Sequence, residues 1–158
     1  MYHAIVRRRV QALFDAVSHG DATPVLAAFA SRFEHSFLGD TALGGTRTSL
    51  IKTRAWYERL FRLLPDIRFH VRRILVSGGP WDTLVLAEWD ETNSGTDGVR
   101  TTNSGVHVVR LKWGRMTQLV ICPDTVGLKA TLDRLAEAGN AEARAAPILD
   151  KPSTGERV

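Results

Sequence analysis

Apolar residues recur at helical spacing near the start of the chain. Residues 3–19 keep their apolar positions on one helical face, which is typical of an amphipathic helix: Val6, Val10, Leu13, Phe14 and Val17. Asp21 suits the N-cap of a second short helix, because Pro24 is tolerated in the first turn of a helix. The sequence therefore predicts two consecutive helices before the spacing changes.

Alternating positions follow, and then a third helical stretch. Within residues 31–45, large side chains alternate with smaller or polar ones and predict a short strand followed by a glycine-rich loop: Phe33, His35 and Phe37. Thr48 suits the N-cap of a third helix, which is expected to end near Leu63 because Pro65 follows. The apolar stripe of this helix consists of Trp56, Tyr57, Leu60, Phe61 and Leu64.

Beyond Asp66 the polarity alternates at every second residue, which is the period of a half-buried strand. Strands are expected at residues 66–76, 81–92, 101–112 and 116–122, with a turn at 77–80 and a loop at 93–98. Helical spacing returns at residues 125–138. Residues 141–158 lack any periodicity, and a partly ordered tail is expected there.

Helices gathered early and strands gathered late favour a single α+β domain over residues 1–140, with helices on one face of a curved antiparallel sheet. No apolar run is long enough to cross a bilayer, and the N-terminus lacks a signal-peptide pattern. The single cysteine, Cys122, fits a reducing compartment. We therefore expect a cytoplasmic protein that does not span a membrane.

The last two strands allow a prediction of their register. A two-residue turn at Trp113-Gly114 would pair Lys112 with Arg115. The same register pairs Val109 with Gln118, His107 with Val120 and Asn103 with Asp124. One face of the sheet would then carry Asn103, His107, Val109, Leu111, Val120, Cys122 and Asp124. A mostly apolar face with a few polar side chains is typical of a small-molecule pocket, although a bulge would shift every later pair.

The net charge of +4 is concentrated between Arg47 and Arg73, where eight basic residues face only Glu58 and Asp66. Such a stretch is one mark of nucleic-acid binding, but no binding motif accompanies it. A solvated helix face, or ion pairs with the acidic stretch at residues 74–100, is the favoured alternative. Scattered histidines and the absence of phosphate-binding glycine motifs predict neither a metal site nor a nucleotide cofactor.

Several short motifs, taken in order, resemble the SnoaL-like branch of the nuclear transport factor 2-like superfamily over residues 3–140. They are Leu13-Phe14-Asp15, Phe33-Glu34-His35, Trp56-Tyr57-Glu58-Arg59, Gly105-Val106-His107-Val108, Trp113-Gly114-Arg115 and Asp124-Thr125-Val126-Gly127-Leu128. The resemblance implies a cone-shaped α+β barrel, a deep pocket at its wide end, and commonly a homodimer formed through the sheet. The superfamily includes polyketide cyclases, isomerases, dehydratases and non-catalytic members, so the fold alone does not decide the function.

The resemblance also implies roles for two residues. His35 falls where ketosteroid isomerase-like members carry a general base, and Asp124 matches an acid/base carboxylate that precedes the last helix of SnoaL-like cyclases. The strands carry no Asp–Arg–Asp set of the epoxide-hydrolase kind, and no Tyr in the first helix matches the oxyanion donor of the isomerase. Those two chemistries are therefore disfavoured. The alternative for Asp124 is the N-cap of the last helix, and the alternative for His35 is a core histidine bonded to backbone.

Five further side chains complete the predicted pocket. Phe37, Trp56 and Trp89 would shape its walls, and Asn103 and His107 would orient a ligand oxygen or serve in a cross-strand network. We expect a small, largely apolar, oxygenated ligand and, if the protein is an enzyme, cofactor-free acid/base chemistry on a carbonyl compound. The alternatives are a non-catalytic binding or dimerisation module and, less favoured, nucleic-acid binding through residues 47–73.

Overall fold

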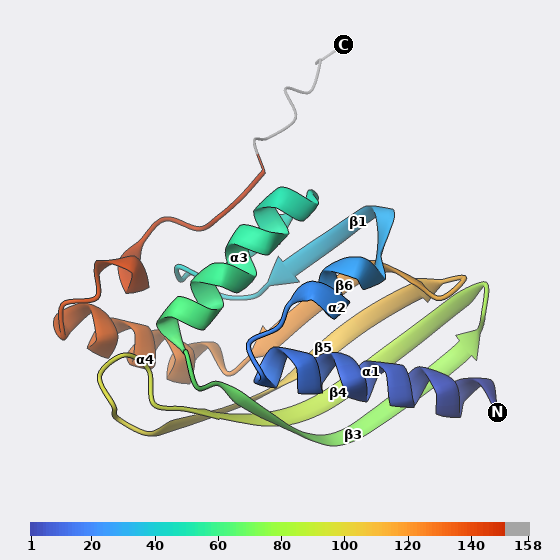
Figure 1. Ribbon diagram of the computed structural model, residues 1–158, viewed down its shortest axis with the longest axis horizontal. Coiled ribbons are helices and arrows are strands. Elements are labelled where there is room, and N and C mark those ends of the chain that lie inside the picture. Colours follow the sequence, from blue (N-terminus) through green and yellow to red (C-terminus); the bar gives the residue numbers. More distant parts are fainter. Residues whose placement is uncertain (151–158) are drawn as a thin grey trace, which may run out of the picture.

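Four α-helices and a six-stranded sheet make up the computed structural model, which describes residues 1–150 (Figure 1). The helices are α1 (Tyr2–Ser18), α2 (Thr23–Ala28), α3 (Leu50–Leu63) and α4 (Thr125–Glu137), followed by the 3₁₀ turn η1 (Ala141–Arg144). The strands are β1 (Phe29–Phe37), β2 (Gly45–Arg47), β3 (Arg68–Gly79), β4 (Asp82–Asn93), β5 (Thr101–Lys112) and β6 (Arg115–Pro123). The α+β class expected from the sequence is confirmed.

Strand order in the sheet is β2-β1-β6-β5-β4-β3. All neighbours are antiparallel except β1 and β6, which are parallel, so the expectation of a wholly antiparallel sheet is wrong at this pair. The chain enters β1 from the two N-terminal helices, and the short β2 pairs with one edge of β1. The β5–β6 hairpin later brings β6 along the other edge, in the same direction as β1. The short β2 was not expected, because three residues beside a glycine-rich segment carry no alternation that could reveal a strand.

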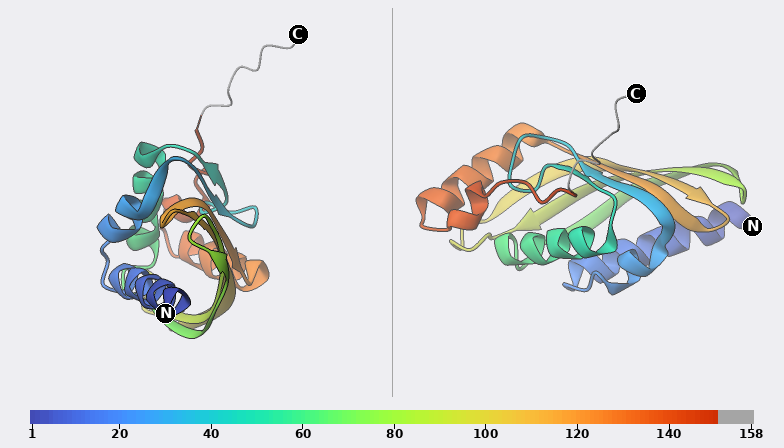
Figure 2. Two further views of the ribbon diagram at one scale, coloured as in Figure 1. Left: turned by 90° about the vertical axis from the view of Figure 1, so that its right-hand side faces the viewer. Right: turned by 90° about the horizontal axis from the view of Figure 1, so that it is seen from above.

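The sheet curls without closing, and α1, α2 and α3 lie on its concave side (Figure 2). At one end of the sheet, α4 lies against the loop between β4 and β5, where Arg134 pairs with Asp97 at 2.6 Å. No helix among residues 1–150 covers the opposite, convex face of β3–β6. The concave face and the three early helices therefore enclose the core.

Helix boundaries differ from the sequence prediction by one or two residues. Ser49, and not Thr48, caps α3, since its hydroxyl accepts a hydrogen bond from the amide of Lys52. The amide of Thr23 bonds to the Asp21 carboxylate, which lies one residue before the N-cap position of α2. Strand β3 continues to Gly79, three residues into the expected turn.

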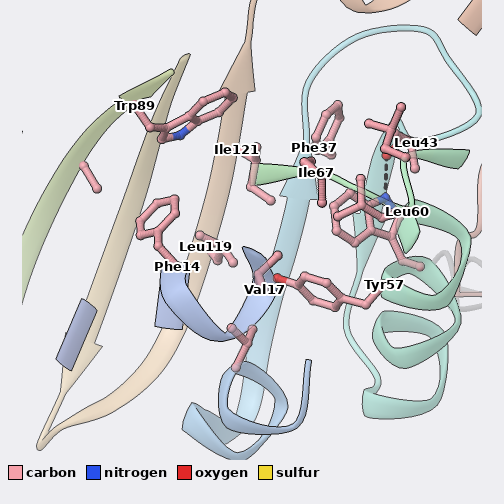
Figure 3. Packing of buried hydrophobic residues seen from close by; sticks show 14 of the residues in the cluster. Phe14, Val17, Phe37, Leu43, Tyr57, Leu60, Ile67, Trp89, Leu119 and Ile121 are labelled. Atoms are coloured by element: carbon pink, nitrogen blue, oxygen red, sulfur yellow. Dashed lines mark hydrogen bonds between the residues drawn. The ribbon is translucent and has the colours of Figure 1, made fainter. Parts of the chain in front are cut away.

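The core is aromatic at its centre (Figure 3). Trp56 is 1% exposed, and its indole N–H donates a 2.7 Å hydrogen bond to the carbonyl of Leu43. That bond joins α3 to the loop that precedes β2. A buried indole needs such a partner, because an unpaired polar group in a core costs about 1–3 kcal/mol.

The predicted register of β5 and β6 holds only next to the turn. Lys112 pairs with Arg115 and Leu111 with Met116, as expected. A bulge between Arg110 and Leu111 then shifts the register by one residue. The later pairs are Val109 with Leu119 and His107 with Ile121, which corrects the predicted partners Gln118 and Val120.

A one-residue bulge turns alternate side chains to the other face of the sheet. Leu119 and Ile121 are consequently buried in the core, whereas Val120 and Cys122 belong to the convex face. The prediction that Val120, Cys122 and Asp124 share the pocket face is therefore wrong.

The segment after α4 returns across the molecule to α3. Glu142 of η1 pairs with Arg59 and Arg62, and Arg59 also donates to the carbonyl of Ala146. At the end of this segment, the Asp150 carboxylate accepts hydrogen bonds from the amide and the hydroxyl of Ser49, at 3.1 and 2.6 Å. Residues 151–158, the rest of the expected tail, lie outside the described residues.

Candidate functional site

A cavity of about 130 Å³ lies between α1, α3 and the concave face of the sheet. All five side chains expected to shape a pocket line it: Phe37, Trp56, Trp89, Asn103 and His107. His35 and Asp124 do not line it. The two residues expected to exchange protons are therefore not brought together in this cavity.

His35 is fully buried, and its surroundings hold it in one protonation state. Its Nδ1 accepts a 3.0 Å hydrogen bond from Nε of Arg47, so the proton of the neutral ring belongs on Nε2. Burial lowers the pKa of His35 well below its usual value, and the positive charge of Arg47 lowers it further. The only lone pair of the neutral ring, on Nδ1, is therefore already occupied by the guanidinium of Arg47. This geometry suits a neutral donor better than a general base.

Asp124 serves as the N-cap of α4. Its carboxylate accepts hydrogen bonds from the amides of Val126 and Gly127 at 3.1 and 3.2 Å. The Asn103 side chain in turn bonds both backbone groups of Asp124, each at 3.0 Å. The capping alternative and the Asn103–Asp124 network are both present in the structure, while an acid/base role for Asp124 stays a prediction.

Glu91 of β4 is the ionisable residue that the sequence reasoning missed. Its side chain is 4% exposed and lines the cavity. Asn103 is its partner on the neighbouring strand β5. Burial raises the pKa of Glu91 to about 7, although the Asn93 amide donates to both carboxylate oxygens at 2.7 and 3.2 Å. The available signal was strand alternation, which puts Glu91 on the same face as the buried Trp89.

Trp89 and His107 form a second polar contact on the cavity wall. The indole N–H of Trp89 donates to Nδ1 of His107 at 2.7 Å. Burial lowers the pKa of His107 to about 3, so the ring is neutral at physiological pH and its proton lies on Nε2. Phe14 packs against the same ring, with centroids 4.7 Å apart. His107 therefore offers a fixed, uncharged polar edge.

Tyr57 of α3 adds a hydroxyl to the cavity. The side chain is 4% exposed and lines the cavity, and its oxygen points away from α3 toward Val17 (Figure 3). Burial raises the pKa of Tyr57, so the group remains a hydroxyl that can donate a hydrogen bond.

Ion pairs neutralise much of the basic stretch between Arg47 and Arg73. The pairs within the described residues are Arg59–Glu142, Arg62–Glu142, Arg72–Asp90 and Arg73–Glu88. Arg47 is buried, and so it presents no charge at the surface. Within residues 1–150, acidic side chains therefore stand beside Arg59, Arg62, Arg72 and Arg73 of this stretch. Residues 1–150 also contain no group of three or more histidine, cysteine or acidic side chains placed to hold a metal ion.

A SnoaL-like domain model matches residues 10–119, which is more than half of the chain. The chain belongs to the SnoaL-like family. The match runs from the middle of α1 to the first half of β6. The cavity-lining residues outside it are Tyr2, Ile5, Val6, Arg9, Ile121, Pro123 and Leu128.

Solved structures show the same fold. A nuclear transport factor 2-like protein of unknown function from Burkholderia pseudomallei is 23% identical, with a TM-score of 0.66 over 79% of this chain and 95% of its own. A protein from Catenulispora acidiphila with a ketosteroid isomerase-like fold, in complex with trimethylamine, is 14% identical, with a TM-score of 0.66 over 78% and 90%. A candidate SnoaL-like polyketide cyclase from a Jannaschia species is 15% identical, with a TM-score of 0.62 over 78% and 88%.

No curated protein matches the chain. Within the described residues, no helix of this SnoaL-like protein is long and apolar enough to cross a membrane. At these identities the neighbours support the fold alone, so the function has to be argued from the cavity.

Proposed function

We propose that this SnoaL-like protein binds a small, largely apolar, oxygenated molecule in the cavity, and that Glu91 exchanges a proton with it. The observation that carries the proposal is a buried carboxyl group on a largely apolar cavity wall, with a pKa of about 7. General acid–base catalysts work best when their pKa lies near the working pH. Glu91 meets that condition, whereas neither His35 nor Asp124 lines the cavity.

Three uncharged groups would complete such a site. The Asn103 amide lies across the sheet from Glu91, and the Tyr57 hydroxyl and the His107 ring also line the cavity. Each of them can hydrogen-bond a ligand oxygen while Glu91 removes or returns a proton on the adjacent carbon. Isomerisation, dehydration and aldol-type cyclisation of carbonyl compounds all begin with this kind of proton transfer.

The size of the cavity limits the ligand. A volume of about 130 Å³ is close to the roughly 150 Å³ of an engineered protein cavity that binds benzene. It is smaller than the roughly 300 Å³ or more of pockets for drug-sized molecules. We therefore propose a ligand no wider than a single ring or an unbranched chain.

Proton exchange on a small cyclic ketone tests this proposal. We expect the protein to accelerate the exchange of the α-protons of cyclohexanone for deuterium in D₂O, measured by NMR. Glu91→Gln should reduce the acceleration by about 100-fold or more, because general acid–base catalysis contributes on the order of 10²–10⁴. Glu88→Gln is the matched control: Glu88 lies on the same strand, but on the convex face, where it pairs with Arg73.

The outcomes separate the two functional alternatives. Exchange that depends on Glu91 and not on Glu88 supports the catalytic proposal. Ketone binding without accelerated exchange would favour the non-catalytic binding module. If the protein neither binds the ketone nor accelerates its exchange, the proposal as a whole is contradicted.

We also propose that the convex face of the sheet joins two copies of the chain. A row of apolar side chains crosses four neighbouring strands on this face: Leu75, Leu86, Val108 and Val120. Leu75 is 53% exposed and Leu86 is 37% exposed, and the ion pair between Arg73 and Glu88 borders the row. An apolar centre with a charged rim is the usual composition of a homodimer interface. A two-fold axis through the row would bring the same face of each copy together.

Sedimentation of two variants tests the dimer. The wild-type protein is expected to sediment at twice its chain mass of 17.5 kDa, and Leu86→Lys is expected to sediment as a monomer, because it places a charge in the apolar centre. Ile51→Lys, at an 80% exposed position on α3, should leave the dimer intact. A monomeric wild-type protein, or equal behaviour of the two variants, would contradict this proposal.

A further inference from the structure

Among the described residues that line the cavity, Arg9 of α1 is the one cationic side chain and Glu91 is the one acidic side chain. The guanidinium of Arg9 lies beside Gly114 in the turn between β5 and β6, since a Cβ atom at Gly114 would be only 3.3 Å from its Nη1. Gly114 has a φ of 74°, so glycine is favoured at this position on both counts. The turn thus leaves room for a guanidinium at this end of the cavity.

The other arginines of this turn and its strands are already engaged. Arg110 forms two hydrogen bonds with the Asp82 carboxylate, and Arg115 donates to the carbonyl of Ala27. Arg9 forms no ion pair or side-chain hydrogen bond with any described residue. Its donors are therefore free for a group that enters the cavity.

The cavity is long, and its two charged side chains lie toward opposite ends. On α1 its lining runs from Tyr2 to Val17, about 22 Å at 1.5 Å per residue. On β5 it runs from Asn103, beside Glu91, to Leu111, beside the turn, about 27 Å at 3.4 Å per residue. The lining residues thus reach from the end that holds Arg9 to the end that holds Glu91, around a small volume of about 130 Å³.

We propose that the ligand has a narrow, unbranched apolar body with a terminal carboxylate, and that Arg9 binds this carboxylate. The forked donors of one guanidinium match the two oxygens of one carboxylate in geometry and in charge. The apolar body then extends along α1 toward Glu91. This inference rests on the proposed function only in taking the cavity as the ligand site, and it specifies the ligand class.

Two probes of equal length test the inference by calorimetry: octanoate and octan-1-ol. The wild-type protein should bind octanoate about 10- to 100-fold more tightly than octan-1-ol, which is the range for a charge-assisted hydrogen-bonded pair. Arg9→Gln should remove this preference without changing the affinity for octan-1-ol. Arg8→Gln is the matched control: Arg8 and Arg9 are both exposed, but Arg8 does not line the cavity.

Each outcome decides the inference. A preference for octanoate that is lost in Arg9→Gln and kept in Arg8→Gln supports it. Equal affinity for the two probes, or equal losses in the two variants, would overturn it while leaving the cavity as a binding site for uncharged ligands. Failure to bind either probe would also overturn it, and the ketone experiment would then decide separately whether the proposed function stands.

Discussion

Replacing Arg47 with methionine is expected to lower the free energy of unfolding by about 3–5 kcal/mol. Arg47 is fully buried and lies 5.4 Å from the centre of the Trp56 ring. Its guanidinium donates to the carbonyls of Gly44 and Ile148 at 3.1 and 2.9 Å, and to Nδ1 of His35 at 3.0 Å. Methionine has a similar length but no donor, so these acceptors would remain buried without partners. Denaturation by urea, followed by tryptophan fluorescence, measures the change.

An exposed arginine on the same part of the chain provides the control. Arg54→Met changes an exposed side chain of α3 and should alter the stability by no more than about 0.5 kcal/mol. Arg47→Lys should recover little of the loss, because an ammonium group cannot reach several diverging acceptors as a guanidinium does. Losses of equal size at positions 47 and 54 would show that the buried hydrogen bonds of Arg47 contribute little.

The second large effect concerns pH. Burial raises the pKa of Glu91 to about 7 in the folded protein, from the 4.5 that is usual for a glutamate. The folded state therefore holds the proton of the Glu91 carboxyl group more tightly than the unfolded state does. The stabilisation that this proton provides is present at low pH and is lost as the pH rises through about 7. The difference corresponds to about 3 kcal/mol, at 1.36 kcal/mol for each pKa unit.

Comparing Glu91→Gln with the wild-type protein isolates this contribution. His107 has a lowered pKa and makes both proteins less stable at acid pH, so its effect cancels in the difference. Relative to wild type, the glutamine variant should gain about 3 kcal/mol between pH 4 and pH 8, measured from urea midpoints across that range. Parallel pH profiles would mean that Glu91 ionises as freely in the folded state as in the unfolded state.

Hydrophobic spacing was sufficient to predict the helices and long strands, since each has a buried face with a regular period. The spacing of hydrophobic residues does not predict the register where a bulge interrupts the pairing of two strands. The bulge beside Leu111 leaves no trace in the polarity of the sequence, and it moves Leu119 and Ile121 to the core face in place of Val120 and Cys122. The predicted walls of the cavity were nevertheless present, because Trp89, Asn103 and His107 lie on strands β4 and β5, before the bulge.

The candidate chemistry was harder to predict than the fold. His35 and Asp124 were chosen by their positions relative to a family pattern, but their environments depend on distant residues. His35 faces Arg47, which follows it across a tight loop, and Asp124 bonds to the free amides of its own helix. Glu91 stands in an acidic stretch, which suggests an exposed surface. Strand alternation nevertheless puts its side chain on the inward face of β4, while those of Glu88 and Asp90 turn outward.

The contacts of the C-terminal segment also restrict the order in which the protein can fold. Ile148 supplies a carbonyl to Arg47, and Asp150 binds the start of α3, so the loop that carries β2 is completed by residues synthesised about one hundred positions later. While the chain is still emerging from the ribosome, Arg47 lacks that carbonyl and α3 lacks that carboxylate. The final closure of the loop around His35 and Trp56 therefore takes place only after Asp150 has been released from the ribosomal tunnel.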